Sequence, residues 1–461
     1  MRGAVVYLFN AKRAKEVQHS FSESNGFVFD LIQYSETEKI RFSTISCIVV
    51  EWELRDDLLF ALMELNSDTR IVFYNEKFIS DIDDTAALKG TLETALTSNN
   101  YALCKSINEL LRFGDILRRR SELQSLPADL QIETTDLCNA KCIMCTHVYD
   151  YGSGTDILET GLIDRIKPIL PFVKTIILHG NGEPFIVRNI EEYLAQLSTY
   201  GIQFVTNTNL SVLSEGILRH LNSDFVELNV SCDGYDKESY ESVRCGLCFE
   251  NFVSNCRIVR EKCPNLNMKM NVVVMRKNME YLDRIAEFAH ELGFQEVVFN
   301  QLCTDERLEN AKEDPYLYRK DYVRAIQAVR TTAKRLNIVV QIPDISVDVD
   351  TGCSCDESTQ PHFIGVCDWL AGRAFINLQG NLAICCMNQK MIVGNVFNQD
   401  IREIWNSEQY VALRKSFFAG EIPLCCAGCD FLVHNRLRFF TMCGNLTFEQ
   451  LKKKQERGIQ L

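Results

Sequence analysis

Hydrophobic residues in the middle of this chain follow two alternating patterns, one typical of strands and one typical of helices. Short apolar runs predict strands, and the segments between them carry apolar residues at helical spacing, as in Tyr281–Leu292. The strands expected here are Leu130–Thr134, Lys174–His179, Gln203–Asn207, Phe225–Ser231, Met268–Met275 and Glu296–Gln301. Six strand–helix units in succession indicate an open parallel barrel, a partial (βα)6 TIM-like fold with its site at the carboxyl ends of the strands.

The N-terminal residues 1–125 predict a separate small α/β domain. Helical patterns at Lys12–Ser22 and Asp56–Leu65 alternate with apolar runs that predict four strands: Val5–Phe9, Val28–Gln33, Cys47–Val50 and Arg70–Tyr74. The region contains no G-x-G-x-x-G, no phosphate-binding loop and no D-x-H-x-x-G pattern of cobalamin-binding domains. We therefore expect a docking or scaffold role for it.

The expected domain boundaries follow from changes in these patterns. Ala86–Arg120 reads as helix, and Ser125–Pro127 marks the start of the barrel, which we place at 128–345. A cysteine-rich domain is expected at 346–445, with a hairpin at Ala374–Leu382 that turns at Gln379 and Gly380. Residues 446–461 form a terminal tail, in which Glu449–Arg457 reads as a charged, solvated helix.

Charge and cysteine content restrict the classes of function. The 461 residues carry a formal net charge of −13, from 49 Lys and Arg against 62 Asp and Glu, which disfavours nucleic acid as a partner. The chain has 20 cysteines, but its N-terminus lacks the pattern of a signal peptide and no run of apolar residues is long enough for a membrane span. We therefore expect a cytoplasmic protein whose cysteines hold a metal or a cluster. Five cysteines in apolar or helical contexts read as small buried hydrophobes instead: Cys47, Cys104, Cys256, Cys263 and Cys303.

The candidate chemistry centres on Cys138, Cys142 and Cys145, spaced C-x3-C-x2-C directly after the first barrel strand. Three thiolates are one too few for a closed tetrahedral site. On a 4Fe–4S cluster they would leave one iron without a protein ligand, open to a small chelating molecule. Two plainer interpretations are a structural zinc site with a fourth ligand from elsewhere, and thiols that bind nothing.

This stretch resembles the signature of the radical S-adenosylmethionine (radical SAM) enzymes. The resemblance implies that SAM chelates the open iron and that an electron from the 4Fe–4S cluster cleaves SAM to methionine and a 5′-deoxyadenosyl radical. It extends to the turn after the second strand, His179-Gly180-Asn181-Gly182-Glu183-Pro184, which resembles the family's GGEP motif with Asn181 in place of the first glycine.

The resemblance also assigns SAM contacts to particular residues. The backbone of Gly182 and Glu183 is expected to receive the amino group of SAM, and Ser231 or, second, Asn209 the ribose hydroxyls. Arg244 lies in a segment whose arginine pairs with the SAM carboxylate, a group that a guanidinium fits with two hydrogen bonds. Without the resemblance, these residues read as turn formers and a surface arginine.

A second cysteine set follows the barrel. Cys367, Cys385, Cys426 and Cys429 show the spacing C-x17-C and C-x2-C with Gly380 between the first two, which matches a closed four-thiolate site for zinc or a cluster. The arrangement resembles the SPASM/twitch extension of radical SAM enzymes, in the shorter form with one auxiliary 4Fe–4S cluster. Adjacent Cys386 and Cys425 compete as ligands. Three further cysteines could support a second auxiliary cluster: Cys353, Cys355 and Cys443.

The expected function is a radical SAM enzyme, an oxidoreductase or maturase that modifies a ribosomal peptide (RiPP-type) or a small molecule. Its auxiliary cluster would aid oxidation, and a reductant such as flavodoxin or ferredoxin would supply electrons. One alternative is a sugar or aminocyclitol dehydrogenase or epimerase of the same superfamily. An alternative of another class is a structural zinc-binding interaction protein without catalysis.

Overall fold

The computed structural model describes the greater part of the barrel and of the following domain, and the strands of the N-terminal region. The described residues are 4–9, 29–33, 45–51, 70–75, 78–81, 84–147, 154, 157–159, 161–305, 308, 310–342 and 367–426. The expected helices Lys12–Ser22, Asp56–Leu65 and Glu449–Arg457 lie outside them, as do Cys353, Cys355, Cys429 and Cys443.

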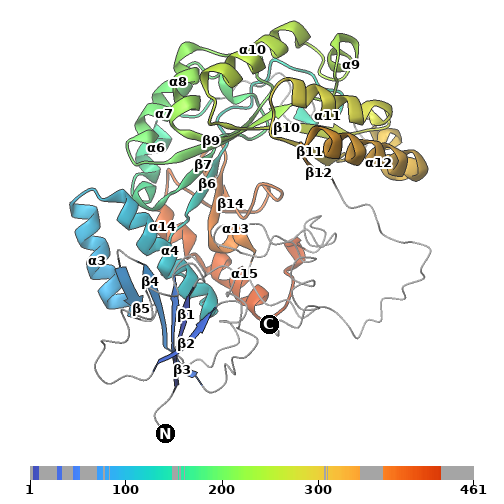
Figure 1. Ribbon diagram of the computed structural model, residues 1–461. Coiled ribbons are helices and arrows are strands. Elements are labelled where there is room, and N and C mark those ends of the chain that lie inside the picture. The colour runs from blue at the N-terminus through green and yellow to red at the C-terminus, as the bar shows by residue number, and fades with distance from the viewer. Residues whose placement is uncertain are drawn as a thin grey trace.

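The N-terminal region contains a five-stranded sheet in the order β2-β1-β3-β4-β5, drawn in blue in Figure 1. Its strands are β1 (Ala4–Phe9), β2 (Phe29–Gln33), β3 (Ile45–Glu51), β4 (Arg70–Asn75) and β5 (Phe78–Asp81). The four strands expected from sequence are present and parallel, and β5 adds an antiparallel edge to β4. Two helices follow, α3 (Thr85–Thr97) and α4 (Tyr101–Leu117).

The single helix expected at Ala86–Arg120 is divided into α3 and α4 because the polar residues between them end one helix and begin the next. Asn99 adopts the left-handed conformation, with φ 53°, which asparagine tolerates better than most residues. The side chain of Asn100 then accepts the backbone N–H of Leu103 and caps the first turn of α4.

The barrel is a continuous parallel sheet that continues into the C-terminal part of the chain. Ten strands lie in the order β12-β11-β10-β9-β8-β7-β6-β13-β14-β15. The parallel barrel strands are β6 (Asp129–Ile132), β7 (Thr175–Ile177), β8 (Gln203–Thr208), β9 (Phe225–Ser231), β10 (Asn267–Val274), β11 (Glu296–Gln301) and β12 (Val339–Gln341). All six strands expected from sequence are found, and β12 adds a seventh that is too short and too exposed to give a clear apolar pattern.

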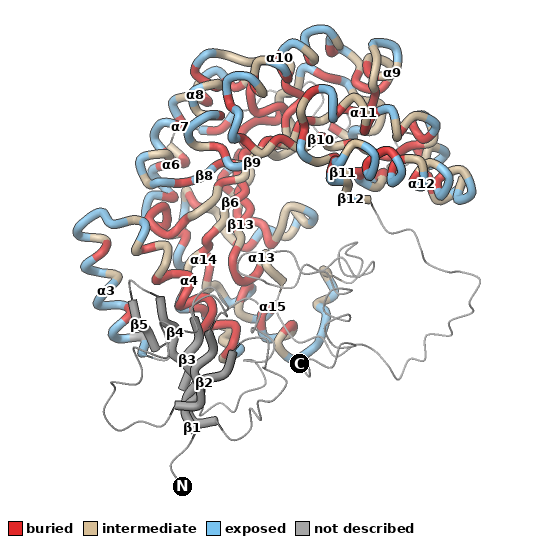
Figure 2. The backbone as a smooth tube through the Cα atoms, viewed as in Figure 1, coloured by how far each residue is buried: buried red, intermediate tan, exposed pale blue. Residues whose placement is uncertain are grey.

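The barrel helices cover one face of the parallel part of this sheet (Figure 1). The longer barrel helices are α6 (Gly161–Ile166), α7 (Ile190–Ser198), α8 (Glu215–Ser223), α9 (Lys237–Glu241), α10 (Phe249–Lys262), α11 (Leu282–Glu291) and α12 (Arg319–Leu336). Between sheet and helices lies the core, which appears as the red inner layer of the tube in Figure 2. Every second residue of β10 is buried there, as the period of two along a strand requires, and β9 shows the same alternation from Leu228 to Ser231.

The remaining short helices are single turns that connect these elements. They are η5 (Leu170–Phe172), η6 (Pro184–Ile186), η7 (Met279–Tyr281), η9 (Asn310–Glu313), η10 (Pro315–Tyr318) and η12 (Leu424–Cys426). Among the described residues, no helix has both the length and the apolar character that crossing a membrane requires.

The C-terminal part joins the barrel through a strand pair rather than through surface contacts alone. β13 (Arg373–Ile376) lies parallel to β6, with Phe375 opposite Gln131, and the expected hairpin leads into β14 (Asn381–Ala383) and β15 (Ile392–Asn395). Gly380 occupies the hairpin turn at φ +72°, a conformation that favours glycine. Three helices complete this part: α13 (Asp368–Ala371), α14 (Ile401–Trp405) and α15 (Glu408–Phe418).

A buried arginine fixes α15 against the segment before the barrel. Arg414 is fully buried, and its guanidinium donates to the carbonyl oxygens of Leu370, Trp405 and Ser121 at 2.5, 2.7 and 3.2 Å. It also stacks on the Trp405 ring, 4.6 Å from the centroid. Because each donor has an oxygen partner, the cost of burying the cation is offset by hydrogen bonds.

Candidate active site

The loop that carries Cys138, Cys142 and Cys145, here called the cysteine loop, leaves the carboxyl end of β6 and is hydrogen-bonded to a second loop. The N–H groups of Lys141 and Ile143 donate to the carbonyls of Cys245 and Val243 at 2.8 and 3.1 Å. Within the loop, the Cys145 N–H donates to the Cys142 carbonyl at 3.1 Å and forms a turn. The thiols of Cys138 and Cys142 are half-buried and that of Cys145 is exposed. All three thiols therefore lie on one ordered loop at the end of the barrel that was expected to hold the site.

The turn after β7 supports the same loop from the other side. The Glu183 N–H donates to the carbonyl of Leu137, immediately before the first cysteine, at 2.8 Å. A Cβ added to Gly182 would lie 2.5 Å from the Thr135 carbonyl oxygen and closer still to that of Leu137. Glycine is therefore required at position 182 by the close approach of two backbones. This contact explains the glycine of the NGEP motif (Asn181–Pro184) in structural terms. We did not predict the contact from sequence.

Glu183 joins the β7 turn to the end of β8. Its carboxylate, only 3% exposed, accepts hydrogen bonds from the Thr208 hydroxyl at 2.5 Å, the Asn209 N–H at 2.7 Å and the Phe185 N–H at 3.2 Å. Burial raises the pKa of this carboxyl group, and these three donors counteract the rise. The side chain thus anchors the site, while only its backbone was predicted to contact SAM.

Asn209 extends this network into the cysteine loop. Its side-chain N–H donates to Asn139, between Cys138 and Cys142, at 2.9 Å, and its oxygen accepts the Ser211 N–H. Ser231, the other candidate for the ribose, ends β9 opposite Asn271 and is half-buried. Both candidates therefore lie at the carboxyl ends of neighbouring strands.

Arg244 lies beside the cysteines with one donor unused. Its Nη2 pairs with the fully buried carboxylate of Asp233 at 2.8 Å, and its Nη1 donates to the Cys142 sulfur at 3.9 Å. The Nε–H is buried and has no hydrogen-bond partner in the described structure. Asp233 in turn accepts the Val273 N–H at 2.7 Å. A buried cation with an unsatisfied donor beside the cysteine loop fits an anionic group of a bound cofactor.

Electrostatics around Cys142 and Asp233 reflect this burial. Desolvation raises the pKa of the Cys142 thiol to about 12, and the nearby Arg244 cation opposes the rise. Burial likewise raises the pKa of the Asp233 carboxyl, again against the effect of Arg244. Asp233 was not predicted from sequence, because an aspartate before Gly234 reads as turn chemistry alone.

The second cysteine set converges as well. Cys367 precedes α13, Cys385 follows β14 and Cys426 lies in η12, 3.8 Å from the Cys425 sulfur. Burial raises the pKa of the Cys426 thiol, and the nearby thiols of Cys425, Cys367 and Cys385 raise it further. Three of the four expected auxiliary ligands are therefore close together, and the fourth, Cys429, lies outside the described residues. An all-sulfur donor set of this kind suits an iron–sulfur cluster or zinc.

Two further residues, which follow β6 and β7, were not singled out from sequence. Glu133 is buried after β6; its carboxylate accepts the side-chain N–H of Asn181 at 2.9 Å and the Leu378 N–H at 3.4 Å. It therefore links the β7 turn to the C-terminal hairpin, and Asn181, the departure from the family motif, has a specific partner. His179 accepts the Asn207 N–H on Nδ1 at 3.1 Å. Polar residues at alternate strand positions could have signalled both.

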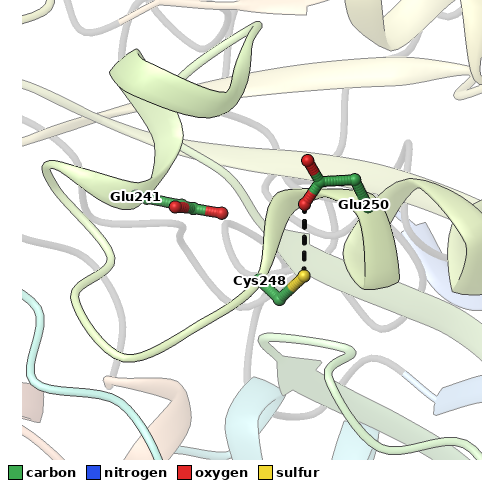
Figure 3. A group of neighbouring side chains, drawn as sticks. All are labelled: Glu241, Cys248 and Glu250. Atoms are coloured by element: carbon green, nitrogen blue, oxygen red, sulfur yellow. Dashed lines mark hydrogen bonds between the residues drawn. The ribbon is translucent and has the colours of Figure 1, made fainter.

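One other group of potential metal ligands occurs in the described part of the chain, on the exposed side of α9 and α10. Glu241, Cys248 and Glu250 present ligand atoms within 4.8 Å of one another (Figure 3). Lys237 already pairs with Glu250 at 2.9 Å and with Glu241 at 3.7 Å, and Cys248 donates to Glu250 at 3.2 Å. These partners account for the charges, so we assign no cation to the group.

Comparison with known families decides the identity of the two cysteine regions. Residues 132–289 match the family model of the radical SAM superfamily, and residues 367–430 match that of the SPASM iron–sulfur cluster-binding domain. The chain carries a radical SAM domain followed by a SPASM domain. The expected cofactors, SAM and 4Fe–4S clusters, are confirmed by these matches.

Curated relatives of the radical SAM domain have different activities. An AdoMet-dependent heme synthase of Methanosarcina barkeri is 24% identical over 334 residues, which cover 67% of this chain and 92% of the relative. A probable GTP 3′,8-cyclase of Metallosphaera sedula is 24% identical over 176 residues, covering 37% of this chain and 54% of the relative. The chain thus spans about half the length of that cyclase.

Solved structures confirm the fold of the radical SAM and SPASM regions. Streptococcus suis SuiB bound to S-adenosylmethionine superposes with a TM-score of 0.51 at 16% identity, covering 72% of this chain and 78% of SuiB. SuiB bound to precursor peptide SuiA superposes with a TM-score of 0.50 at 15% identity, covering 69% of this chain and 72% of SuiB. Native anSMEcpe with bound AdoMet superposes with a TM-score of 0.50 at 18% identity, covering 72% of this chain and 98% of anSMEcpe.

Proposed function

We propose that this protein is a radical SAM enzyme that modifies a peptide, with one auxiliary cluster in its SPASM domain. The main support is the position of the cysteine loop. Backbone hydrogen bonds hold it between the NGEP turn and the Val243–Cys245 segment, at the carboxyl end of a parallel barrel. A peptide substrate is supported by the likeness in fold to SuiB, which binds its precursor peptide.

The chain's own residues take the following roles in the proposal. Cys138, Cys142 and Cys145 would hold the SAM-binding cluster, and Arg244 would meet the SAM carboxylate through its unused Nε–H. When bound, the cluster and SAM together supply a radical that abstracts hydrogen from an unactivated carbon. Asp233 holds the arginine in place, and Glu183 and Asn209 fix the loop on which the cysteines stand.

The proposal assigns the auxiliary cluster to Cys367, Cys385, Cys426 and Cys429, with an oxidising role toward the substrate. The proposal places the protein in a reducing, cytoplasmic setting, where thiols stay available as cluster ligands. A small electron-transfer protein such as flavodoxin or ferredoxin would then deliver electrons.

The test is an assay of SAM cleavage by anaerobically purified protein reduced with dithionite. The amount of 5′-deoxyadenosine formed measures the cleavage. We expect slow turnover without substrate and faster turnover with a peptide substrate, whose mass then shifts after co-expression. Absence of 5′-deoxyadenosine with both clusters present would reject the enzyme assignment. The small-molecule alternative is supported by the heme synthase relative, and it predicts acceleration by a small molecule and none by peptides.

A further inference from the structure

An arginine that is not a cluster ligand lies at the junction of the barrel and the SPASM domain. Arg373 is the first residue of β13 and pairs in register with Asp129 on β6. Its Nη2 lies 3.7 Å from the Asp129 carboxylate and 3.5 Å from that of Asp368. Asp368 directly follows Cys367, the first expected ligand of the auxiliary cluster. The charge of Arg373 therefore lies between the edge of the barrel and the auxiliary cysteine set.

The carboxylates leave hydrogen-bond donors of Arg373 unused. Both distances are longer than an N–H···O hydrogen bond, which spans about 2.7–3.2 Å. The Nε–H is buried and has no hydrogen-bond partner among the described residues, and Cζ lies 5.1 Å from the centroid of the Trp369 ring. A buried N–H without an acceptor is costly, so the arrangement fits an acceptor that a bound cluster supplies.

The auxiliary cysteines are close enough to act on this cation. Burial works against the charge of Arg373, but its neighbours raise its pKa, first the two carboxylates and then the ionised thiols of Cys386 and Cys367. Cys367 is in turn one of the thiols that raise the pKa of Cys426 beyond the effect of burial. Arg373 and the converging cysteines therefore form one electrostatic group.

The two carboxylates differ in their relation to the cysteines. Burial raises the pKa of Asp129, and two cations oppose the rise, Arg373 and Arg112 on α4. Asp129 is therefore shared between two arginines. Asp368, by contrast, is adjacent in sequence to Cys367. One cation and one anion of a single ion pair, Arg373 and Asp368, thus lie beside the same cluster ligand.

Charges beside a cluster act on its reduction potential. A 4Fe–4S cluster bound by four thiolates is an anion and gains one more negative charge on reduction. A nearby cation, or an N–H that donates to a cluster sulfur, stabilises the reduced form and raises the potential, whereas a nearby carboxylate lowers it. Because Arg373 is half-buried, salt and water screen its charge less than that of a surface arginine.

We propose that Arg373 raises the reduction potential of the auxiliary cluster and that Asp368 lowers it, so that this ion pair sets how readily the cluster accepts an electron. The inference rests on the auxiliary cluster of the proposed function and deepens it, because it assigns control of that cluster to two residues that are not ligands. The electron comes from the substrate radical, which is oxidised as the cluster is reduced. An oxidised flavodoxin or ferredoxin then takes the electron from the cluster.

The test is a redox titration of the auxiliary cluster, with the electron paramagnetic resonance of its reduced form as the readout. The parent protein is the full-length variant Cys138→Ala/Cys142→Ala/Cys145→Ala, in which the auxiliary cluster is the one that remains. In this parent, Arg373→Met should lower the equilibrium constant for one-electron reduction at least tenfold, which is about 59 mV. Asp368→Asn should shift the potential in the opposite direction, to higher values.

Two further variants separate the effect of charge from that of structure. Arg373→Lys keeps the cation and loses the Nε–H, so its potential should lie between those of the parent and of Arg373→Met. Arg402→Met removes an exposed arginine of α14 in the same domain and should leave the potential unchanged. Iron content and melting temperature are measured on each variant. If Arg373→Met loses the cluster, the rise expected for Asp368→Asn decides the question.

The possible outcomes distinguish the inference from the proposed function. A structural disturbance of the cluster would move the potentials of Arg373→Met and Asp368→Asn in the same direction. Such a common shift, or an unchanged potential in either variant with full iron, would overturn the inference. A parent protein without about four irons would instead overturn the auxiliary cluster of the proposed function.

Discussion

Glu183 donates its backbone N–H to the carbonyl oxygen of Leu137 at 2.8 Å, which ties the NGEP turn to the start of the cysteine loop. The neighbouring Gly182 packs so tightly against this loop that a Cβ has no room. The order of the cysteine loop therefore depends on a residue that lies on a different strand–helix unit.

Gly182→Ala should displace the cysteine loop, because the added Cβ meets two backbone carbonyls rather than a flexible side chain. We expect loss of most of the iron bound at Cys138, Cys142 and Cys145, and a lower melting temperature. The control is Gly90→Ala in α3, where a Cβ meets nothing within 4 Å. That variant should be stabilised by about 0.5–1 kcal/mol, since alanine favours helix over glycine. Full iron in Gly182→Ala would contradict the account.

Arg244→Lys tests whether the guanidinium binds the SAM carboxylate. Lysine keeps the charge beside Asp233 but lacks the Nε–H and the planar fork. We expect the KM for SAM in the cleavage assay to rise at least tenfold, about 1.4 kcal/mol, while iron content is retained. Arg257→Lys on the exposed side of α10 is the matched control and should leave KM unchanged. An unchanged KM for SAM in Arg244→Lys would show that Arg244 only pairs with Asp233 and does not bind the SAM carboxylate.

Arg414→Met tests how the SPASM domain is attached. The substitution leaves the carbonyl oxygens of Leu370 and Trp405 without their donor in a buried site, at a cost of about 3–4 kcal/mol in unfolding free energy. Denaturant unfolding measures this cost. Arg402→Met removes an exposed side chain whose partner Asp400 is half-buried, and it should cost no more than about 1 kcal/mol. Equal losses in the two variants would show that the buried hydrogen bonds do not hold the domain.

His179 should make the protein sensitive to acid. Burial, and next the charge of Arg373, lower the pKa of its imidazole to about 4, whereas the unfolded chain has a value of about 6.5. The unfolded state therefore takes up the proton first, and stability present above pH 6.5 is lost as the pH falls toward 4.

At pH 5 this loss amounts to about 2 kcal/mol. His179→Asn keeps an acceptor for the Asn207 N–H and has no proton to gain, so its stability should depend less on pH by that amount. Melting temperatures between pH 7.5 and 5 measure the difference, with His290→Gln, exposed on α11, as the control. Parallel pH curves for wild type and His179→Asn would contradict the assignment.

The strands of the barrel were predictable because each is an apolar run between polar turns. Phe225–Ser231 and Glu296–Gln301 agree with the structure at both ends. β12 was missed because Val339–Gln341 is an exposed three-residue edge strand, and its pairing with β11 is a long-range contact that local pattern does not encode.

The placement of Cys138, Cys142 and Cys145 on a loop after β6 was predictable, because an apolar strand pattern precedes them, and their role as cluster ligands stays a prediction. Glu133, Asp233 and the pairing of β13 with β6 were not predictable, because each gains its role from residues distant in sequence. Glu133 reads as an ordinary strand-end residue until Asn181 and Leu378 are placed beside it. The roles of the SAM-contacting residues remain predictions that the variants above address.

The first measurement is the content of iron and acid-labile sulfide per chain, on anaerobically purified protein and on the variant Cys138→Ala/Cys142→Ala/Cys145→Ala. We expect about eight irons in the wild type and about four in the variant, which should also form no 5′-deoxyadenosine. Zinc in place of iron, or an unchanged iron content in the triple variant, would contradict a SAM-cleaving cluster on this loop.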